Sequence, residues 1–403
     1  MRVLVLTSLF PERPGEKNGN FIHAQVCAVA RCGASVDVLF AQSWRPRLTF
    51  LSGNKRRASS DGSPLFRLHR AQFISFPRYV LGRAANWIAA LFLCRRISAI
   101  ATERGIDLIH AHDHKMAYVA IIVGRRLGIP VIVTLHGINT AGRLLNSAAK
   151  RAQLSATLSG AARVVLVGSP IGAFYEQFVS RSSLEIVSNG FHLPATVSPS
   201  NRIPRRFKTR IVTVTNLHST KGVDYLLRSI AELVFDNNSE VELVIVGSGP
   251  ERNNLLHLAR DLGIEHQVSF TGELLHADAI AEIGAGDIFC LPSWLESCGL
   301  VYMEAMALGK PTIGCRGQGA ADLISHGLTG YLVEPRSTGA LTDIFLKIIA
   351  NPLDAERIAQ RGKDHAWRDL TWDQSTRKLM HVYESALGAF SADGSARGQR
   401  KHR

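Results

Sequence analysis

Short apolar runs alternate with amphipathic stretches along both halves of the chain, and this alternation constrains the fold more than any other feature. Strands that are buried on both faces are apolar throughout, so such runs are typical of parallel sheets covered by helices. In the first half we expect strands at residues 2–8, 35–40, 107–111, 130–135 and 163–167. We expect helices between them at residues 20–32, 79–104, 115–127 and 142–160.

The second half repeats the same alternation. We expect strands at residues 210–215, 241–246, 268–271, 287–291, 311–314 and 330–333. Helices fill the intervals and continue through residues 338–350 and 355–369. A last amphipathic helix at 372–388 carries apolar residues at helical spacing, namely Leu379, Val382, Tyr383, Ala386 and Leu387.

The segment between the halves has the composition of a linker. Residues 192–208 contain Pro194, Pro199, Pro204 and a basic cluster, with little periodicity. A chain of 403 residues also exceeds what one hydrophobic core usually sustains. We therefore predict an α/β protein with two Rossmann-like domains whose parallel sheets face a central cleft. The predicted parts are a first domain at 1–190, a linker at 191–209, a second domain at 210–371, a helix at 372–390 that packs back on the first domain, and a disordered basic tail at 391–403.

Basic charge is concentrated in the first half of the chain. Residues 1–190 hold 24 Lys and Arg against 9 Asp and Glu, whereas residues 191–403 hold 23 against 24. This asymmetry favours an anionic partner for the first domain, such as a membrane surface or a lipid phosphate. We expect no nucleic acid as a partner, because no nucleic-acid-binding motif is present. The stretch 79–96 suits either an interfacial helix or a buried crossover helix, and the sequence leaves both open.

Cysteine usage and hydropathy indicate a cytoplasmic protein. The six cysteines form no CxxC pair and lie mostly in apolar runs, which favours a reducing compartment. The N-terminal apolar run ends at Phe10 and is too short for a signal peptide. No segment reaches the ~18 apolar residues of a membrane span. Together with the basic first half, this favours peripheral attachment to the inner face of the cell membrane.

Residues 291–309 are the most informative segment about function. Glu296 and Glu304 flank a Cys-Gly-Leu hinge at 298–300, where a strand and loop pass into a helix. Such a junction directs free backbone N–H groups and the positive end of the helix dipole at an anion. Two carboxylates beside an anion site suit hydroxyl groups rather than phosphate. A nucleotide sugar is the common metabolite that offers hydroxyls on both sides of a diphosphate.

Two glycine-containing loops and one lysine also precede helices. Gly247 and Gly249 follow a strand, but Arg252 stands at the third glycine position of GxGxxG, so a tight turn is favoured over a phosphate loop. Gly19 precedes a helix and lets backbone approach a ligand closely. Lys221 opens a helix, which the helix dipole disfavours, so a neighbouring anion is a natural reason for its position.

The histidines near strand ends form a further group. His110, His112 and His114 surround Asp113, and alternation along a strand would place the histidines on one face. No other motif with metal-ligand spacing accompanies them, so we expect polar residues lining a cleft and no metal site. His136 follows the strand expected at 130–135 and should lie at the mouth of the same cleft.

These motifs resemble those of a known family. Residues 292–311 read PSxxExCGLxxxEAMAxGKP, which is similar to the E-x7-E block of glycosyltransferase family 4, retaining enzymes of the GT-B fold. The resemblance covers nearly the whole chain and is nearest to bacterial envelope and exopolysaccharide transferases of the teichuronic acid type. The other matching motifs, in family order, are the Gly19 loop, Thr134-x-His136-Gly137, Ser188-Asn189-Gly190, Lys221-Gly222, Gly247-x-Gly249-Pro250 and Gly327-x-x-Gly330.

The resemblance implies a role for each matching residue. Glu296 would contact hydroxyls of the donor hexose, Glu304 the ribose, and Lys221 the diphosphate. His136 would line the donor sugar from the opposite domain, so that His136, Lys221 and Glu296 form the catalytic set. The remaining donor-binding residues would be Gly19, Asn216, Gly272, Leu274, Cys298, Gly299 and Leu300, with the base read by backbone near 272–274. The acceptor would be a glycan or a polyprenyl-diphosphate-linked glycan, and neither cofactor nor metal is expected.

Two departures from the family pattern leave alternatives open. Asn216-Leu217 stands where the family commonly has Arg-Leu, and Cys298 stands where it often has Phe. A charge-assisted hydrogen bond is roughly twice as strong as a neutral one, so Asn216 puts the affinity for the diphosphate or the identity of the donor in doubt. A GT-B-like nucleotide-sugar epimerase and a non-catalytic nucleotide-sugar-binding subunit remain as alternatives. The broken GxGxxG disfavours an NAD-dependent enzyme.

Overall fold

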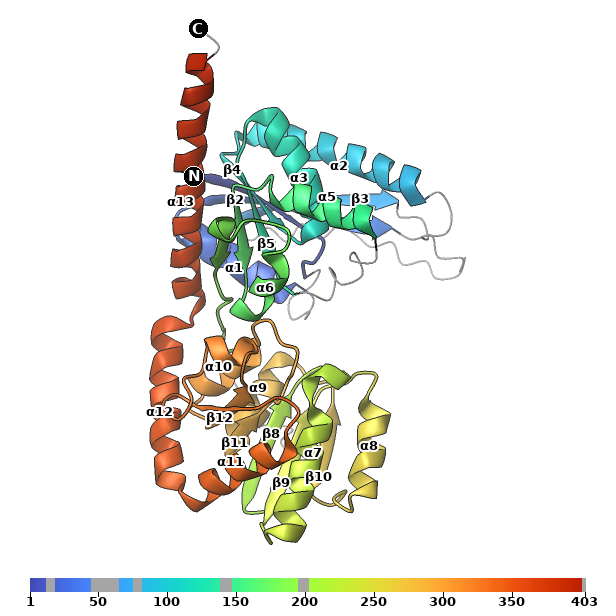
Figure 1. The fold of residues 1–403 in the computed structure, drawn as a ribbon, viewed down its shortest axis with the longest axis vertical. Coiled ribbons are helices and arrows are strands. Elements are labelled where there is room, and N and C mark those ends of the chain that lie inside the picture. Colours follow the sequence, from blue (N-terminus) through green and yellow to red (C-terminus); the bar gives the residue numbers. More distant parts are fainter. Residues whose placement is uncertain (12–18, 45–64, 75–81, 138–146, 195–202, 401–403) are drawn as a thin grey trace. The chain divides into compact units, whose positions relative to one another are not determined.

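The computed structural model describes residues 1–11, 19–44, 65–74, 82–137, 147–194 and 203–400. These residues form two compact units. The first unit contains Met1–Val167, Ile171–Val187 and Thr376–Arg403, and the second contains Gly168–Pro170 and Ser188–Ser375. The C-terminal segment therefore returns to the unit in which the chain begins (Figure 1).

The first unit is built on a seven-stranded sheet in the order β3-β2-β1-β4-β5-β6-β7, and all of its strand pairs are parallel. The strands are β1 (Arg2–Thr7), β2 (Ser35–Trp44), β3 (Phe66–Ile74), β4 (Leu108–His112), β5 (Val131–Leu135), β6 (Arg163–Leu166) and β7 (Leu184–Ile186). Every residue of β4 and β5 is buried, and apart from His110, His112 and Thr134 the two strands are apolar.

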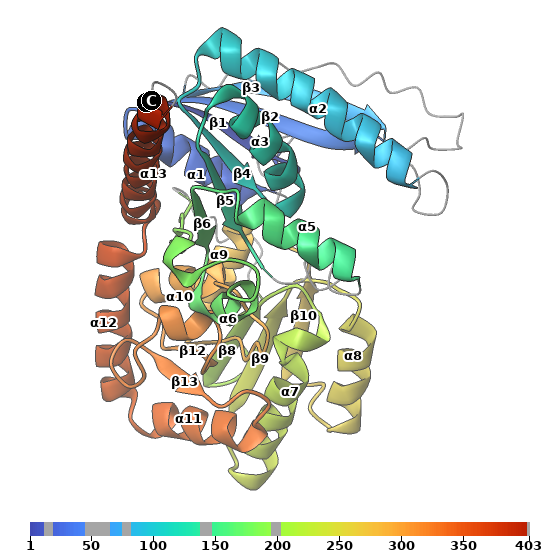
Figure 2. The same ribbon diagram turned by 45° about the horizontal axis from the view of Figure 1, so that its top comes forward.

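Helices cover both faces of this sheet. On one face, α1 (Asn20–Arg31) and α13 (Trp372–Arg400) share a core with β1, β2, β4 and β5, in which Val26 and Leu379 are almost fully buried. On the other face, α2 (Gly82–Arg104), α3 (His114–Leu127) and α5 (Ala148–Leu158) pack side by side (Figure 2). A short helix, α6 (Gly172–Tyr175), follows β6.

The second unit contains a six-stranded parallel sheet in the order β10-β9-β8-β11-β12-β13. Its strands are β8 (Thr209–Val214), β9 (Val241–Val246), β10 (Val268–Gly272), β11 (Ile288–Cys290), β12 (Thr312–Cys315) and β13 (Tyr331–Val333). One face packs against α7 (Val223–Ala231), α8 (Arg252–Asp261), α11 (Thr338–Ala350) and α12 (Pro352–Asp369). Two further helices, α9 (His276–Ala285) and α10 (Leu300–Ala307), pack against each other. The helix α9 contacts β8, and α10 contacts β12.

Both sheets have the doubly wound topology that the alternation predicts. Strand order reverses between β1 and β4 in the first sheet and between β8 and β11 in the second. Open parallel sheets bind ligands outside the carboxyl ends of their strands at such switch points. Residues after β1 and β4 in one unit, and after β8 and β11 in the other, are thus placed to bind ligands.

Most expected elements are present, with small differences at their ends. The strands β3 and β7 were not predicted. Among the residues that the structure describes, β3 pairs only with β2, at the edge of the sheet. It carries Arg67, His69 and Arg70 among its apolar residues, which hides the strand pattern. The helix predicted to end at residue 388 extends to Arg400, so the tail at 391–403 is not disordered throughout as expected, because adding residues to an existing helix costs less than nucleating one.

Some expectations fall outside the described residues, namely most of the loop before Gly19, the beginning of the helix at 142–160, part of the linker and the last three residues. None of the described helices is long and apolar enough to cross a membrane.

Candidate nucleotide-sugar site

Lys221 and Glu296 meet at the switch point of the second sheet. Lys221 ends a short 3-10 turn, Ser219–Lys221, after β8, and Glu296 lies in the loop after β11. The Lys221 Nζ donates a hydrogen bond to Glu296 Oε2 over 2.7 Å, with side chains only 20% and 14% exposed. The structure therefore places a cation and a carboxylate that can accept hydrogen bonds side by side at the edge of the sheet.

The turn that carries Lys221 is held by the segment after β11. The backbone N–H of Trp294 donates to Thr220 O over 3.0 Å, and the indole Nε1 donates to Ser219 O over 3.1 Å. Gly222 has a φ of 68°, and a Cβ there would lie 2.2 Å from the carbonyl oxygen of Pro292. Close backbone packing and two hydrogen bonds from one residue thus fix the position of Lys221 relative to the loop of Glu296.

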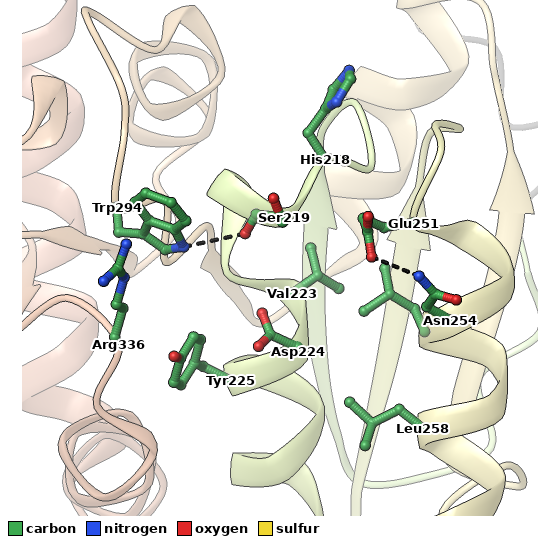
Figure 3. Close-up of a pocket in the computed structure, with 11 residues that line it drawn as sticks. His218, Ser219, Val223, Asp224, Tyr225, Glu251, Asn254, Leu258, Trp294 and Arg336 are labelled. Carbon is green, nitrogen blue, oxygen red and sulfur yellow. Dashed lines mark hydrogen bonds between the residues drawn. The ribbon is translucent and has the colours of Figure 1, made fainter.

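A pocket of about 280 Å³ adjoins this turn (Figure 3). The Arg336 guanidinium carbon lies 3.8 Å from the centre of the Trp294 ring, so Trp294 is held on its ring face as well as at its Nε1. Neither Lys221 nor Glu296 lines the pocket. Its lining residues are His218, Ser219, Val223, Asp224, Tyr225, Glu251, Asn254, Leu255, Leu258, Trp294 and Arg336.

The loop between Glu296 and α10 is fixed by close packing. The backbone N–H of Glu296 donates to Gln318 Oε1 over 3.1 Å, and its carbonyl accepts from Gly319 N over 2.9 Å. A Cβ at Gly319 would lie 2.6 Å from the backbone nitrogen of Cys298, so only glycine fits. Gly299 precedes α10 with a φ of 77° and turns the chain into the helix. The free N–H groups of the first turn of α10 consequently follow Glu296 directly.

Cys298 is a buried thiol in this loop. Burial raises the pKa of Cys298 to about 12, so the side chain is a neutral thiol at physiological pH and a poor nucleophile.

Glu304 lies on α10 and bonds to the start of α9. Its Oε1 is 2.8 Å from His276 Nε2, and its side chain is 13% exposed. His276 follows β10 and Leu274, so the structure brings Glu304 to the segment from which the resemblance implies base recognition. The turn after β9 also joins this edge, because the N–H of Gly247 donates to Gly272 O over 2.8 Å.

Asn216 and the Gly247–Gly249 turn lie against each other. The N–H of Leu217 donates to Ser248 O over 3.0 Å, and a Cβ at Gly249 would lie 2.4 Å from Leu217 O. The two glycines therefore serve a tight turn that packs against the segment of Asn216, in agreement with the favoured sequence interpretation. Asn216 itself is exposed.

In the first unit, His136 lies directly after β5 and bonds to a histidine of β4. Its Nε2 is 2.9 Å from His112 Nδ1, the two rings are stacked, and Phe21 of α1 contacts His136 with ring centres 4.7 Å apart. Burial lowers the pKa of His136 to about 4, so the ring is neutral near pH 7. Gly19 precedes α1 with a φ of 82°, and a Cβ there would lie 2.7 Å from the backbone of Phe10. Both the backbone conformation and the close packing explain why glycine occupies this position.

His114 does not join the other histidines, since it begins α3. In the described part of the chain, no three His, Cys, Asp or Glu side chains gather in a way that could hold a metal ion. Sequence reasoning missed Trp294, Gln318 and His276, because each acts through a contact with a residue distant in the sequence. Of these three residues, only Trp294 could have been suspected from the sequence, because it lies two residues before Glu296.

Comparisons with known proteins identify the family of the chain. Residues 19–190 match the glycosyl transferase 4-like domain, and residues 200–365 match glycosyl transferases group 1. N-acetyl-alpha-D-glucosaminyl L-malate synthase of Bacillus anthracis is 25% identical, over 74% of this chain and 79% of its own length. The solved structure of Anabaena HepE in complex with UDP is similar with a TM-score of 0.70 at 20% identity, covering 96% of this chain and all of HepE. Sucrose-phosphate synthase of Thermosynechococcus elongatus has the same TM-score and identity, covering 96% of this chain and 99% of its own.

Two parallel Rossmann-like sheets and a site with basic and acidic side chains at a switch point define a protein of the GT-B class. The chain is a glycosyltransferase of the family 4 type.

Proposed function

We propose that this enzyme transfers a hexose-type sugar, with retention of the anomeric configuration, from a nucleoside diphosphate sugar to a glycan or polyprenyl-diphosphate-linked acceptor in envelope or exopolysaccharide synthesis. The observation that carries the proposal is the Lys221–Glu296 pair at the carboxyl edge of β8 and β11. The loop of Glu296 leads into α10, and the Glu304 carboxylate lies on the same helix.

Each side chain has a role that follows from its chemistry. Lys221 and the first N–H groups of α10 stabilise the negative charge that grows on the departing diphosphate. Glu296 accepts hydrogen bonds from hexose hydroxyls, and Glu304 accepts from the ribose. The contacts of Lys221 and of the α10 N–H groups with the diphosphate strengthen as the bond to the sugar breaks. These groups therefore supply the positive charge that a metal cation would otherwise supply.

Retention is proposed to proceed on one face of the sugar. The obvious soft nucleophile in this loop, Cys298, is a buried neutral thiol, and Glu296 is engaged by Lys221. In the proposed step, the bond between the anomeric carbon and the diphosphate oxygen breaks while the acceptor oxygen approaches from the same face. The leaving phosphate takes the proton of the acceptor hydroxyl, so that proton and charge balance without a covalent enzyme intermediate.

The acceptor is proposed to bind with the first unit at an anionic membrane surface. On α2, Leu91 and Phe92 are exposed, and on the neighbouring α3 Tyr118 and Ile122 are exposed. The same helices expose Arg95, Arg96, Arg125 and Arg126. Exposed apolar side chains together with exposed arginines are typical of interfacial helices, and they favour this interpretation of residues 79–96 over an ordinary crossover helix buried on one side.

Thermal unfolding with UDP, GDP, ADP and dTDP, alone and as their hexose derivatives, tests the proposal. A ligand at 100 times its dissociation constant adds about 2.7 kcal/mol to the free energy of unfolding, which raises Tm measurably. The similarity to HepE, solved with UDP-glucose, places UDP-glucose first in the panel. Stabilisation by one base, followed by release of that nucleoside diphosphate on adding acceptor lipid extracts, supports the transferase.

The alternatives give different results in the same experiment. A non-catalytic subunit weakened at Asn216 would bind the nucleotide and release no diphosphate. An epimerase would invert a ring carbon of the free nucleotide sugar, which NMR of the sugar detects without any acceptor. No stabilisation by any nucleotide would contradict the proposed donor site.

A further inference from the structure

The pocket beside the Lys221 turn is formed entirely by residues of the second unit. Asp224 and Tyr225 lie near the start of α7, and Asn254 and Leu258 lie one turn apart on α8. Figure 3 shows Tyr225 on one side of the pocket and Asn254 and Leu258 on the other. Its volume of about 280 Å³ is near the lower limit of the ~300–1,000 Å³ typical of small-molecule pockets. The pocket therefore suits a ligand of one ring rather than a whole nucleotide sugar.

Trp294 is a fixed wall of this pocket. Its Nε1 donates a hydrogen bond to Ser219 O over 3.1 Å, and the guanidinium carbon of Arg336 lies 3.8 Å from the centre of its ring. Arg336 has a φ of 60°, which is uncommon for a residue other than glycine. Residues in such conformations cluster at sites that bind ligands. The indole is thus held in position on its edge and on one face before any ligand binds.

Two carboxylates and an amide supply hydrogen-bonding groups to the pocket. Asn254 Nδ2 donates to Glu251 Oε2 over 2.9 Å, which leaves the side-chain oxygen and a second N–H of Asn254 for a ligand. Asp224 is half-buried in the first turn of α7. Its carboxylate has no hydrogen-bond or ion-pair partner in the part of the chain that the structure describes. Asp224 is consequently available to accept hydrogen bonds from a ligand.

The charges of the pocket disfavour ionic and wholly apolar ligands. Asp224 and Glu251 outnumber the guanidinium of Arg336, so a phosphate group would be repelled. A cation would find one face of Trp294 already occupied by Arg336, and the two like charges would repel each other. An apolar ligand would remove water from Asp224 without replacing its hydrogen bonds. A neutral ligand that carries both hydroxyl groups and apolar surface remains.

A pyranose ring has this combination of surfaces. The C–H groups on its face pack against aromatic and aliphatic side chains, which Trp294, Tyr225 and Leu258 supply. Hydroxyl groups at its edge donate to carboxylate and amide oxygens, which Asp224 and Asn254 supply.

We propose that this pocket binds one neutral pyranose residue of a glycan, as a second carbohydrate site of the enzyme. The site is separate from the proposed donor site, because neither Lys221 nor Glu296 lines the pocket. The inference goes beyond the proposed function, since it requires neither a nucleotide sugar nor a transfer step.

The experiment follows the indole signal of Trp294 in the full-length protein. The chain has five tryptophans, so the indole N–H spectrum of ¹⁵N-tryptophan-labelled protein is simple, and Trp294→Phe identifies the Trp294 signal. The probes are the methyl glycosides of glucose, galactose, mannose and N-acetylglucosamine. We expect the Trp294 signal to move with at least one of them, with a Kd of about 1–10 mM, because a single ring makes few contacts. No movement with any of the four at about 50 mM would overturn the proposal.

Two substitutions locate the bound sugar. Asp224→Ala should raise the Kd at least about tenfold, the loss expected for a hydrogen bond to a charged group. Glu296→Gln, in the proposed donor site, should leave the Kd unchanged. The reverse pattern, with binding lost in Glu296→Gln and kept in Asp224→Ala, would place the sugar in the donor site and contradict the second site.

Asp354→Ala is the matched control, because it removes a carboxylate from the first turn of α12, away from the pocket. It should not change the Kd; a weakening equal to that in Asp224→Ala would show that the loss of a first-turn carboxylate, and not of a sugar contact, causes the effect. If Asp224→Ala does not fold, Asn254→Ala at an exposed position of α8 takes its place and should raise the Kd about three- to tenfold. An unchanged Kd in that variant would also overturn the proposal.

The titration contains no nucleotide and needs no turnover. A protein that binds the glycoside through Asp224 and yet transfers no sugar would contradict the proposed function and leave this inference standing. A protein that transfers sugar while its Trp294 signal does not respond to any glycoside would do the opposite.

Discussion

Lys221 Nζ and Glu296 Oε2 are 2.7 Å apart, although 75 residues separate them in the sequence. This hydrogen-bonded ion pair joins the turn after β8 to the loop after β11. In the proposed mechanism, a diphosphate sugar exchanges this bond for one from Lys221 to phosphate and one from a hydroxyl to Glu296.

Replacing Lys221 by alanine should reduce kcat by ~10²–10³, because the growing charge on the diphosphate loses its cationic partner. Steady-state kinetics at saturating nucleotide sugar measures this effect. Lys378→Ala, which removes an exposed lysine of α13, is the control and should leave kcat unchanged. A loss below tenfold in Lys221→Ala would make Lys221 a surface residue without a catalytic role.

Glu304→Ala should weaken nucleotide binding, since its carboxylate is assigned to the ribose hydroxyls. Calorimetric titration with the nucleoside diphosphate selected by thermal unfolding should give an affinity lower by at least tenfold, the loss expected for a hydrogen bond to a charged group. Glu334→Ala removes an exposed carboxylate of the same unit and should have no effect. An unchanged affinity in Glu304→Ala would remove Glu304 from the donor site.

Trp294→Phe should lower kcat moderately while leaving the fold intact. The phenyl ring can still pack beneath Arg336, but the hydrogen bond from Nε1 to Ser219 O is lost, so the turn that carries Lys221 is less fixed. We expect a loss of about three- to tenfold in kcat, corresponding to one ordinary hydrogen bond. An unchanged kcat together with a lowered Tm would show that this clamp contributes to stability alone.

Stability should fall as the pH decreases from about 6.5 toward 4. His110 and His136 have pKa values of about 3 and about 4 in the folded protein, below the ordinary value, so the unfolded chain binds more protons in this window. The free energy of unfolding therefore rises with pH there and becomes level above pH 6.5, with up to ~1.4 kcal/mol per pH unit for each histidine. Urea unfolding at pH 5 and 7 measures the difference. His110→Gln should reduce the difference and His381→Gln, at an exposed position, should not.

Binding to vesicles should require anionic lipid and weaken with added salt. The exposed arginines of α2 and α3 supply the attraction, which salt screens over about 10 Å at 0.1 M. Co-sedimentation with phosphatidylglycerol vesicles should decrease in the double variant that combines Arg95→Glu and Arg125→Glu. The control is Arg228→Glu on α7 of the other unit, which should leave co-sedimentation unchanged. Equal binding to neutral phosphatidylcholine vesicles would contradict the membrane assignment.

The sequence predicts the elements of the fold well where burial dictates composition. β9 and α11 have the predicted bounds. A strand buried on both faces is recognised by a run of apolar residues, and a helix by an apolar stripe at helical spacing. β3 has no such apolar pattern, since an edge strand pairs on one side only and carries charged residues. The helix α13 runs farther than its apolar pattern, because that pattern marks only the part that packs on the first sheet.

For the site, the sequence placed His136 after a strand, Lys221 at the start of a helix, and Glu296 and Glu304 on either side of a hinge that leads into a helix. The prediction that they belong to one donor site came from the resemblance to glycosyltransferase family 4. Only the tertiary structure decided their partners: Glu296 for Lys221, His276 for Glu304, and His112 for His136. Hydrogen bonds depend on distances of a few tenths of an ångström between distant parts of the chain. Spacing along a sequence does not encode such distances, whereas strand order and packing do.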